Sequence, residues 1–306
     1  MKTNYTNRII LISDMHYTTN LSAAELKLVH PDAKASVASG TAFGHTQEEK
    51  VDCIVEDMNT HIEREPVDAV LVLGDLSIDD YSFRKLPENY CKKFKELCMD
   101  ILPCPSYAIP GNHDSYPNEM WEDVFGYGRQ FSLQIKDAAF IMLDTYSDEP
   151  ATTASGSAYV GINMEYLKAE LEKFPKGPIF LCSHYFHPND YTEEFIELLN
   201  NNKRIVCLFD AHTHKNKIIP INEHVKQRKI NIGGYGYEGF YCEEKRIWDF
   251  NTFDEAWAWG YEVLEWNEDE AHVYHVKPAY RYIATNGIID YPGAIENELT
   301  IKINTK

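Results

Sequence analysis

Six short apolar runs recur through the first two thirds of this 306-residue chain, and each ends in a cluster of polar residues. Runs of this length, rich in β-branched and aliphatic residues, are typical of buried strands. The expected strands cover residues 8–13, 68–74, 106–110, 139–144, 178–183 and 204–210. The runs therefore predict the sheets and also the edge at which functional residues gather.

Apolar residues at helical spacing lie between several of these runs. Helices are expected at 46–62, 88–101, 163–174 and 192–200. Thr46 and Glu49 form a capping box for the first, Ile101 is expected to face inward from the second, and Asn163 caps the third. This alternation predicts an α/β fold whose partly parallel sheets are covered by helices, with ligands bound beyond the carboxyl ends of the strands.

The whole chain, 1–306, is predicted to form one domain with two additions. Residues 17–45 are rich in Thr, Ser, Ala and Gly and are expected to be a loop insertion, either a lid over the first strand end or an inert surface excursion. Residues 240–306 are expected to be a C-terminal extension that begins with an aromatic-rich stretch. Core packing of these rings is favoured over an aromatic binding wall.

Charge and composition narrow the function classes. The net charge of −19 has no basic stripe to offset it, so a polymeric nucleic acid is a disfavoured partner. No apolar run is long enough to span a membrane, and residues 1–8 are polar, so we expect no membrane association and a cytoplasmic location. The seven cysteines form no Cys-x-x-Cys pair. We expect reduced thiols, with Cys182 and Cys207 in the core.

Residues able to bind metal ions follow the first two runs. Asp14 and His16 come directly after the first run, one residue apart, and are expected to point the same way from an extended backbone. Asp75 follows Gly74 at the end of the second run. An exposed carboxylate there can offer its two oxygens to two cations, as in two-metal hydrolases.

The later runs supply further ligand types. Asn112 offers a neutral carbonyl oxygen within the sequence Gly-Asn-His-Asp, and His184, His212 and His214 supply imidazoles. Mixed imidazole and carboxylate ligands suit Mn, Fe, Zn or Ni better than calcium. A single histidine at a strand end is more often a hydrogen-bonded residue than a ligand. Five strand ends that all carry such residues favour a metal site.

The ordered set Asp14-x-His16, Gly74-Asp75, Gly111-Asn112-His113-Asp114, His184 and His212-x-His214 resembles the calcineurin-like metallophosphoesterase superfamily. The resemblance covers about two thirds of the chain. It implies a four-layer α-β-β-α fold with two mixed β-sheets and a dinuclear metal centre at one edge. It places Asp14, His16 and His214 on one ion, Asn112, His184 and His212 on the other, and Asp75 between both.

The resemblance also implies two catalytic residues that are not ligands. His113 would protonate the leaving alkoxide, and Asp114 would orient it. The chain departs from the family pattern at Ala211, where Gly is usual, so a small backbone adjustment is expected. Asp114 in place of Glu, together with the lack of an Arg-Gly after the second motif, Gly74-Asp75, argues against a protein Ser/Thr phosphatase. Ile78 stands where a purple acid phosphatase would need Tyr.

These residues predict a phosphoric ester hydrolase that acts on small phosphodiesters or phosphomonoesters with two divalent or mixed-valence metal ions. Three alternatives stay open: a non-catalytic metal-binding scaffold, a nuclease of the same superfamily, and a mononuclear zinc hydrolase. The segments 17–45, 116–131 and 235–241 are where selectivity is expected. The sequence leaves the native metals and the oligomeric state open.

Overall fold

A computed structural model describes most of the chain. The described residues are 5–18, 28, 31–32, 47–77, 88–153, 155–213, 217–229, 240–242, 247–249, 260–284, 287–291 and 293–303.

The first sheet has six strands in the order β16-β13-β12-β1-β2-β3. Its strands are β1 (Asn7–Ile12), β2 (Ala69–Leu73), β3 (Ser106–Ile109), β12 (Tyr261–Trp266), β13 (Glu270–Lys277) and β16 (Ala294–Lys302). Strands β1, β2 and β3 are parallel, whereas β12 pairs antiparallel with β1 and begins an antiparallel half. The sheet is therefore mixed.

The second sheet also has six strands, in the order β4-β5-β6-β7-β9-β8. Its strands are β4 (Phe131–Ile135), β5 (Ala138–Leu143), β6 (Ile179–Ser183), β7 (Ile205–Asp210), β8 (Lys217–Pro220) and β9 (Lys226–Lys229). Strands β5, β6, β7 and β9 are parallel, and the edge strands β4 and β8 are antiparallel to their neighbours. This sheet is mixed as well.

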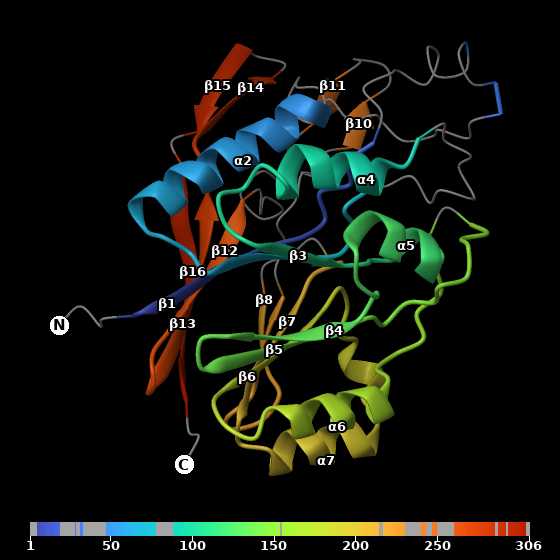
Figure 1. The fold of residues 1–306 in the computed structure, drawn as a ribbon. Coiled ribbons are helices and arrows are strands. Elements are labelled where there is room, and N and C mark those ends of the chain that lie inside the picture. Colours follow the sequence, from blue (N-terminus) through green and yellow to red (C-terminus); the bar gives the residue numbers. More distant parts are fainter. Residues whose placement is uncertain are drawn as a thin grey trace.

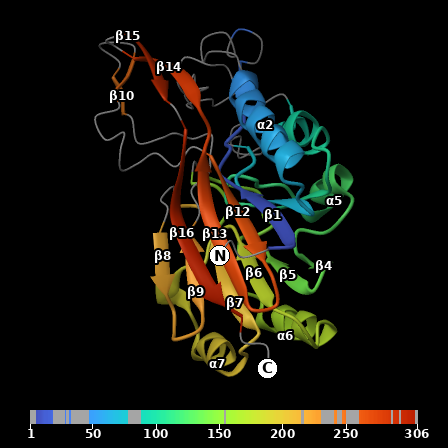
Figure 2. The same ribbon diagram turned by 90° about the vertical axis from the view of Figure 1, so that its left-hand side faces the viewer.

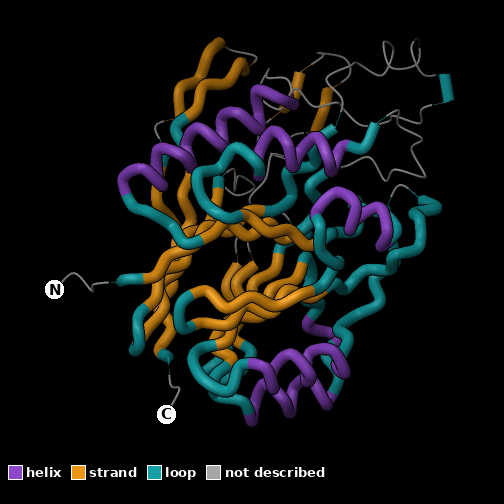
Figure 3. Tube along the Cα trace, in the orientation of Figure 1, coloured by secondary structure: helices purple, strands orange, loops and turns teal. Residues whose placement is uncertain are grey.

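Helices cover the outer face of each sheet (Figure 1). On the first sheet lie α2 (Gln47–Arg64) and α4 (Tyr90–Phe94), which continues into the π-helix η2 (Lys95–Met99), while α6 (Met164–Lys173) and α7 (Glu193–Asn201) cover the second. Figures 2 and 3 show the two sheets stacked between these helices. The remaining elements are α5 (Asn118–Phe125), the 3-10 turn Pro188–Asp190, and the hairpins β10 (Phe240–Cys242) with β11 (Ile247–Asp249) and β14 (Tyr280–Ala284) with β15 (Gly287–Tyr291). The predicted four-layer fold is confirmed.

Alternation along the strands produces two separate cores. In β5, Phe140 and Met142 join the core between the sheets, while Ile141 and Leu143 face α6 and α7. Successive side chains of a strand point to opposite faces of its sheet, so a strand buried on both faces reads as a continuous apolar run. This is why these strands are recognisable in the sequence.

All six strands predicted from apolar runs are present, with ends shifted by at most one residue. The third and fourth helices are also confirmed, with the side chains of Asn163 and Thr192 accepting hydrogen bonds at their N-caps. The prediction that Ile101 faces inward is wrong. Its side chain is 53% exposed, because the helix has already ended at Met99. The proposed capping residue Thr46 lies outside the described residues.

Several strands carry no equally clear signal. Strand β4 belongs to a hairpin whose turn places Lys136 at φ 55°, and β12, β13 and β16 come from the predicted C-terminal extension but complete the first sheet. Tyr261 packs in the core, as expected for this stretch, whereas 250–259 lie outside the described residues. The predicted insertion 17–45 is also mostly outside them, although Tyr17 forms a bridge to Ser77.

Cys182 and Cys207 are buried in the core, as predicted. The six cysteines whose side chains are described are free thiols. Among the described helices, none is long and apolar enough to cross a bilayer. The cytoplasmic location stays a prediction.

A buried ion pair joins the two sheets. Arg228 of β9 donates from Nη2 to both carboxylate oxygens of Glu262 on β12, at 2.9 and 3.0 Å, and Nδ1 of His275 lies 3.1 Å from Glu262 Oε1. All three side chains are at most 1% exposed. Burial alone would raise the pKa of Glu262, but Arg228 and His275 outweigh it and lower the pKa. Glu262 is thus a buried anion held by the Arg228 guanidinium and by a contact with the His275 ring.

We expect Glu262→Gln to destabilise the fold by about 3–5 kcal/mol, because it leaves the Arg228 charge buried without its counter-ion. Urea unfolding measures this difference. The matched control is Glu296→Gln, which breaks a partly exposed pair with Lys277 and should change stability by less than about 1 kcal/mol. Because the pKa of Glu262 is lowered on folding, its stabilising contribution is fully present above the ordinary glutamate pKa. It is lost as the pH falls through the pKa of Glu262 in the folded protein. The difference in the free energy of unfolding between the wild type and Glu262→Gln should therefore become smaller in acid. Equal destabilisation by Glu262→Gln and Glu296→Gln would contradict this role of Glu262.

Candidate metal centre

The predicted site residues that the structure describes lie where strands of both sheets end. Backbone hydrogen bonds continue beyond the strands and tie these ends together: Asp14 N donates to Gly74 O at 3.0 Å, and His16 N donates to Asp75 O at 2.9 Å. In the second sheet, Ala211 N donates to His184 O at 2.9 Å. Asp14, His16, Asp75 and His184 are thus each placed by a strand and by a backbone hydrogen bond to the neighbouring strand end.

The prediction of an extended backbone at Asp14 and His16 is wrong, because both residues are left-handed. Their φ angles are 51° and 46°, and Asp75 and His212 follow with 49° and 65°. These are four of the six non-glycine residues with positive φ among the described residues. Such conformations cost about 1–3 kcal/mol each and cluster at functional sites. At the Ala211 departure, it is the following His212 that takes the positive φ.

One group of side chains has the spacing of ligands around a single ion. His184 Nε2 lies 3.2 Å from Asp75 Oδ2 and 3.3 Å from His212 Nδ1, which lies 3.0 Å from Asn112 Oδ1. Two atoms bonded to one ion at about 2.1 Å lie roughly 3.0–3.4 Å apart. These four residues therefore converge as a ligand set would.

The orientation of His184 fits the same interpretation. Its Nδ1 lies 2.7 Å from the carbonyl oxygen of Leu73, which accepts a hydrogen bond from it. This bond places a proton on Nδ1, so Nε2, which faces Asp75 Oδ2, is the nitrogen that a metal ion would bind. Metal-binding histidines are commonly fixed in this way by a backbone carbonyl.

A second group shares Asp75. His16 Nε2 lies 3.8 Å from Asp14 Oδ1 and 3.6 Å from Asp75 Oδ2. His16, Asp75 and His113 each offer an atom within 4.8 Å of the others, as do Asp75, His184 and His212. His214, the remaining predicted ligand, lies outside the described residues.

Asp75 is buried, with only 1% of its surface exposed, whereas the sequence predicts an exposed carboxylate at this position. Its Oδ1 accepts a hydrogen bond from His113 N at 2.9 Å, and a Cβ at Gly111 would lie 2.2 Å from this oxygen. A Cβ at Gly74 would lie 2.7 Å from the His184 ring. The two glycines are therefore required by close packing around the carboxylate.

The electrostatics of the cluster favour a cation. Burial alone would raise the pKa of Asp75, but His184, His113 and His16 together hold it well below its usual range. Burial opposes protonation of His184, yet Asp75 outweighs burial and raises the pKa of His184 to about 9. The buried carboxylate thus attracts positive charge strongly, and divalent ions would supply it in place of protons. The donor set fits a transition metal.

Asp114 connects the loops behind the site. Its Oδ2 accepts from Gly111 N at 2.9 Å and Leu76 N at 3.1 Å, and its Oδ1 accepts from Ser77 N at 3.0 Å. Burial and the nearby Asp75 raise the pKa of Asp114 to about 6. These contacts join the loop after β2 to the loop after β3. They favour a role in holding both loops, beyond the orientation of His113 that the resemblance implied.

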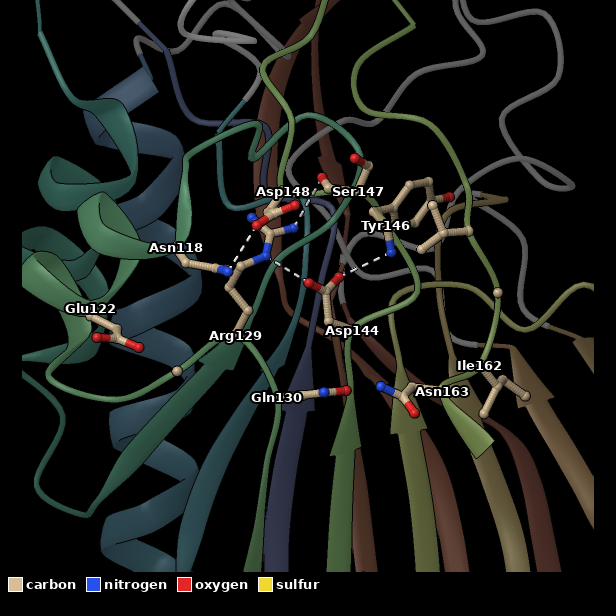
Figure 4. A pocket seen from close by; sticks show the side chains of 13 residues that line it. Asn118, Glu122, Arg129, Gln130, Asp144, Tyr146, Ser147, Asp148, Ile162 and Asn163 are labelled. Atoms are coloured by element: carbon tan, nitrogen blue, oxygen red, sulfur yellow. Dashed lines mark hydrogen bonds and ion pairs between the residues drawn. The ribbon is translucent and has the colours of Figure 1, made fainter. Parts of the chain in front are cut away.

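The sequence interpretation missed the aromatic side of the site. The Tyr146 hydroxyl lies 3.5 Å from His212 Nδ1, and the Tyr185 ring lies 4.5 Å from the His212 ring. Tyr146 also lines a polar cavity of about 510 Å³ together with Asn118, Glu122, Arg129, Asp144 and Asp148 (Figure 4). Tyr146 follows the end of β5 just as the ligands follow the other strands, so its position was a usable signal.

Comparisons with known proteins identify relatives of this chain. The family model described as calcineurin-like phosphoesterase matches residues 7–216. A protein of Arcobacter nitrofigilis named "Probable glycerophosphodiester phosphodiesterase GpdQ" is 28% identical over 179 residues, 50% of this chain and 60% of its own length. A Pseudoalteromonas protein named "Probable cyclic nucleotide phosphodiesterase PSM_A2567" is 29% identical over 51% of this chain and 59% of its own length. The match thus covers less than two thirds of each relative.

Solved structures share the fold at low identity. A dimetal phosphatase from Danio rerio covers 98% of this chain and 100% of its own, with a TM-score of 0.61 at 10% identity. GAP50 of Plasmodium covers 99% of this chain and 90% of its own, with a TM-score of 0.51 at 13% identity. At these identities the likeness shows the fold alone. Because the family model matches more than half of the chain, this protein belongs to the calcineurin-like phosphoesterase family.

Proposed function

We propose that this protein is a metal-dependent phosphoesterase that hydrolyses small phosphodiesters or phosphomonoesters at a dinuclear metal centre. The observation that carries the proposal is the position of Asp75, whose Oδ2 lies 3.2 Å from His184 Nε2 and 3.6 Å from His16 Nε2. In two-metal hydrolases the two ions lie about 3.5–4 Å apart, close enough for one carboxylate to bind both. The two groups around Asp75 provide places for two such ions.

The proposed ligands divide between the two positions. Asn112, His184 and His212 hold one ion, Asp14 and His16 hold the other together with His214, and Asp75 is shared. Divalent ions bound there would supply an acidified water and positive charge beside the phosphoryl group. Mn, Fe, Zn and Ni all suit these ligands, and cellular availability selects among them.

His113 is the proposed proton donor. Its backbone N–H is fixed by Asp75, and its ring lies 5.3 Å from the His16 ring, edge to face. From this position the imidazole stands beside the proposed ions and can hold a proton for the departing alkoxide oxygen. A general acid placed in this way contributes about 10²–10⁴-fold to the rate.

The substrate proposal rests on charge and on the names of relatives. Both curated relatives carry names of phosphodiesterases that act on small molecules, a glycerophosphodiester and a cyclic nucleotide. The net charge of −19 repels polymeric phosphate backbones. A small phosphodiester is therefore the preferred substrate class, and phosphomonoesters come second.

A screen of Mn-loaded protein tests this function. We expect turnover of bis(p-nitrophenyl) phosphate and of at least one diester among cyclic nucleotides and glycerophosphodiesters, with little cleavage of oligonucleotides. Metal analysis of the same sample should find two ions per chain. Two ions without turnover of any ester would point to a scaffold, one ion to a mononuclear hydrolase, and preferred cleavage of oligonucleotides to a nuclease.

Asp75→Asn should reduce bound Mn from two ions per chain to less than one. The neutral amide cannot bind two cations with charged oxygens, so both positions weaken together. Inductively coupled plasma spectrometry of dialysed protein measures the metal content. Asp269→Asn, in an exposed turn, is the matched control and should keep both ions. Loss of only one ion from Asp75→Asn would argue against a shared carboxylate.

His113→Ala should keep both ions but lose about 10²–10⁴-fold in kcat on alkyl phosphate esters. Activity on p-nitrophenyl esters should be largely retained, because that leaving group departs without a proton. Paired kcat measurements on the two ester types test this. A loss of metal would instead make His113 a ligand, and equal losses on both esters would exclude the acid role.

A further inference from the structure

Tyr146 lies beside the candidate ligands but is neither a ligand nor the proton donor of the proposed reaction. Its hydroxyl lies 3.5 Å from His212 Nδ1, and its ring centroid lies 5.7 Å from that of His184. The side chain is 5% exposed. The hydroxyl therefore lies on the side of the cluster where Asn112, His184 and His212 converge.

The backbone of Tyr146 is held firmly. Its N–H donates to Asp144 Oδ1 at 3.0 Å, and Asp144 Oδ2 accepts from Arg129 Nε at 2.6 Å (Figure 4). Arg129, 4% exposed, also donates from Nη1 to the carbonyl oxygen of Tyr116 at 2.7 Å. On its other side Tyr146 pairs with Tyr159 through a β-bridge, and the two rings lie 5.7 Å apart. These contacts fix the ring before any substrate binds.

The chemistry of the site explains what such a hydroxyl could do. A phosphoryl group bound beside two ions keeps oxygen lone pairs that the ions do not all satisfy. A fixed donor aimed at these oxygens stabilises the charge that develops in the transition state without reorganisation. A neutral phenol supplies one such donor.

We infer that Tyr146 is a further catalytic residue, whose hydroxyl donates a hydrogen bond to a non-bridging phosphoryl oxygen of the bound substrate. This inference rests on the proposed phosphoesterase function. It assigns Tyr146 to the substrate and not to the metal, and it makes Asp144 and Arg129 the residues that position it. Tyr146 also lines the polar cavity that Asn118 and Glu122 help to form.

Tyr146→Phe tests the inference, because it removes the hydroxyl and keeps the ring packing. Loss of a hydrogen bond to a charged group changes a binding or rate constant by a factor of about 10–100. We expect the variant to keep two Mn ions, to bind inorganic phosphate about tenfold more weakly by calorimetry, and to lose about 10–100-fold in kcat on bis(p-nitrophenyl) phosphate. The thermal midpoint of unfolding should stay close to that of the wild type.

Tyr159→Phe is the matched control, since it removes a second tyrosine hydroxyl from a ring that packs on the Tyr146 ring. It should bind phosphate like the wild type. Loss of an ion from Tyr146→Phe would make Tyr146 a metal ligand, and unchanged phosphate affinity with unchanged kcat would leave it a packing residue; either result overturns the inference. If the wild type binds phosphate but cleaves no ester, the proposed function fails, and phosphate affinity still decides the role of Tyr146.

Discussion

The carboxylate of Asp75 is a negative charge buried between strand ends of two different sheets. One oxygen accepts the backbone N–H of His113, and the other faces His16 from the first sheet and His184 from the second. Moving such a charge out of water is unfavourable unless partners surround it. The loops after β1, β2, β3 and β6 all approach this one group, so the geometry of the site follows from the need to compensate it.

That compensation requires an unusual backbone. Asp14, His16, Asp75 and His212 all adopt left-handed conformations, and Gly74 and Gly111 leave no room for a Cβ. Strain of this kind persists only when surrounding contacts over-determine it. The contacts here are the hydrogen bonds between adjacent strand ends and those of the buried Asp114 carboxylate. The rigid sandwich therefore stores the conformation that a cation would use.

The same sandwich needs its two sheets to keep a fixed separation. Apolar side chains from both sheets fill the space between them, and the Arg228–Glu262 pair crosses it directly. Leu11 of β1 pairs with Glu262, and Phe209 of β7 pairs with Arg228, so this ion pair lies level with the strand ends that carry the candidate metal ligands. A shift of one sheet against the other would separate His184 from Asp75. Stability and site geometry thus depend on the same packing.

The sequence by itself determined the strands that are buried on both faces and the polar residues that follow them, because both are local patterns along the chain. Asp14, Asp75, Asn112 and His184 were identifiable as a set for that reason. It did not determine that β12, β13 and β16 complete the first sheet, since charged residues and histidines interrupt the apolar pattern of β12 and β13, and β16 is an edge strand. Nor could it show the left-handed backbone or the burial of Asp75. The contact between Tyr146 and His212 joins residues 66 positions apart in the chain, and only the tertiary structure brings those atoms together.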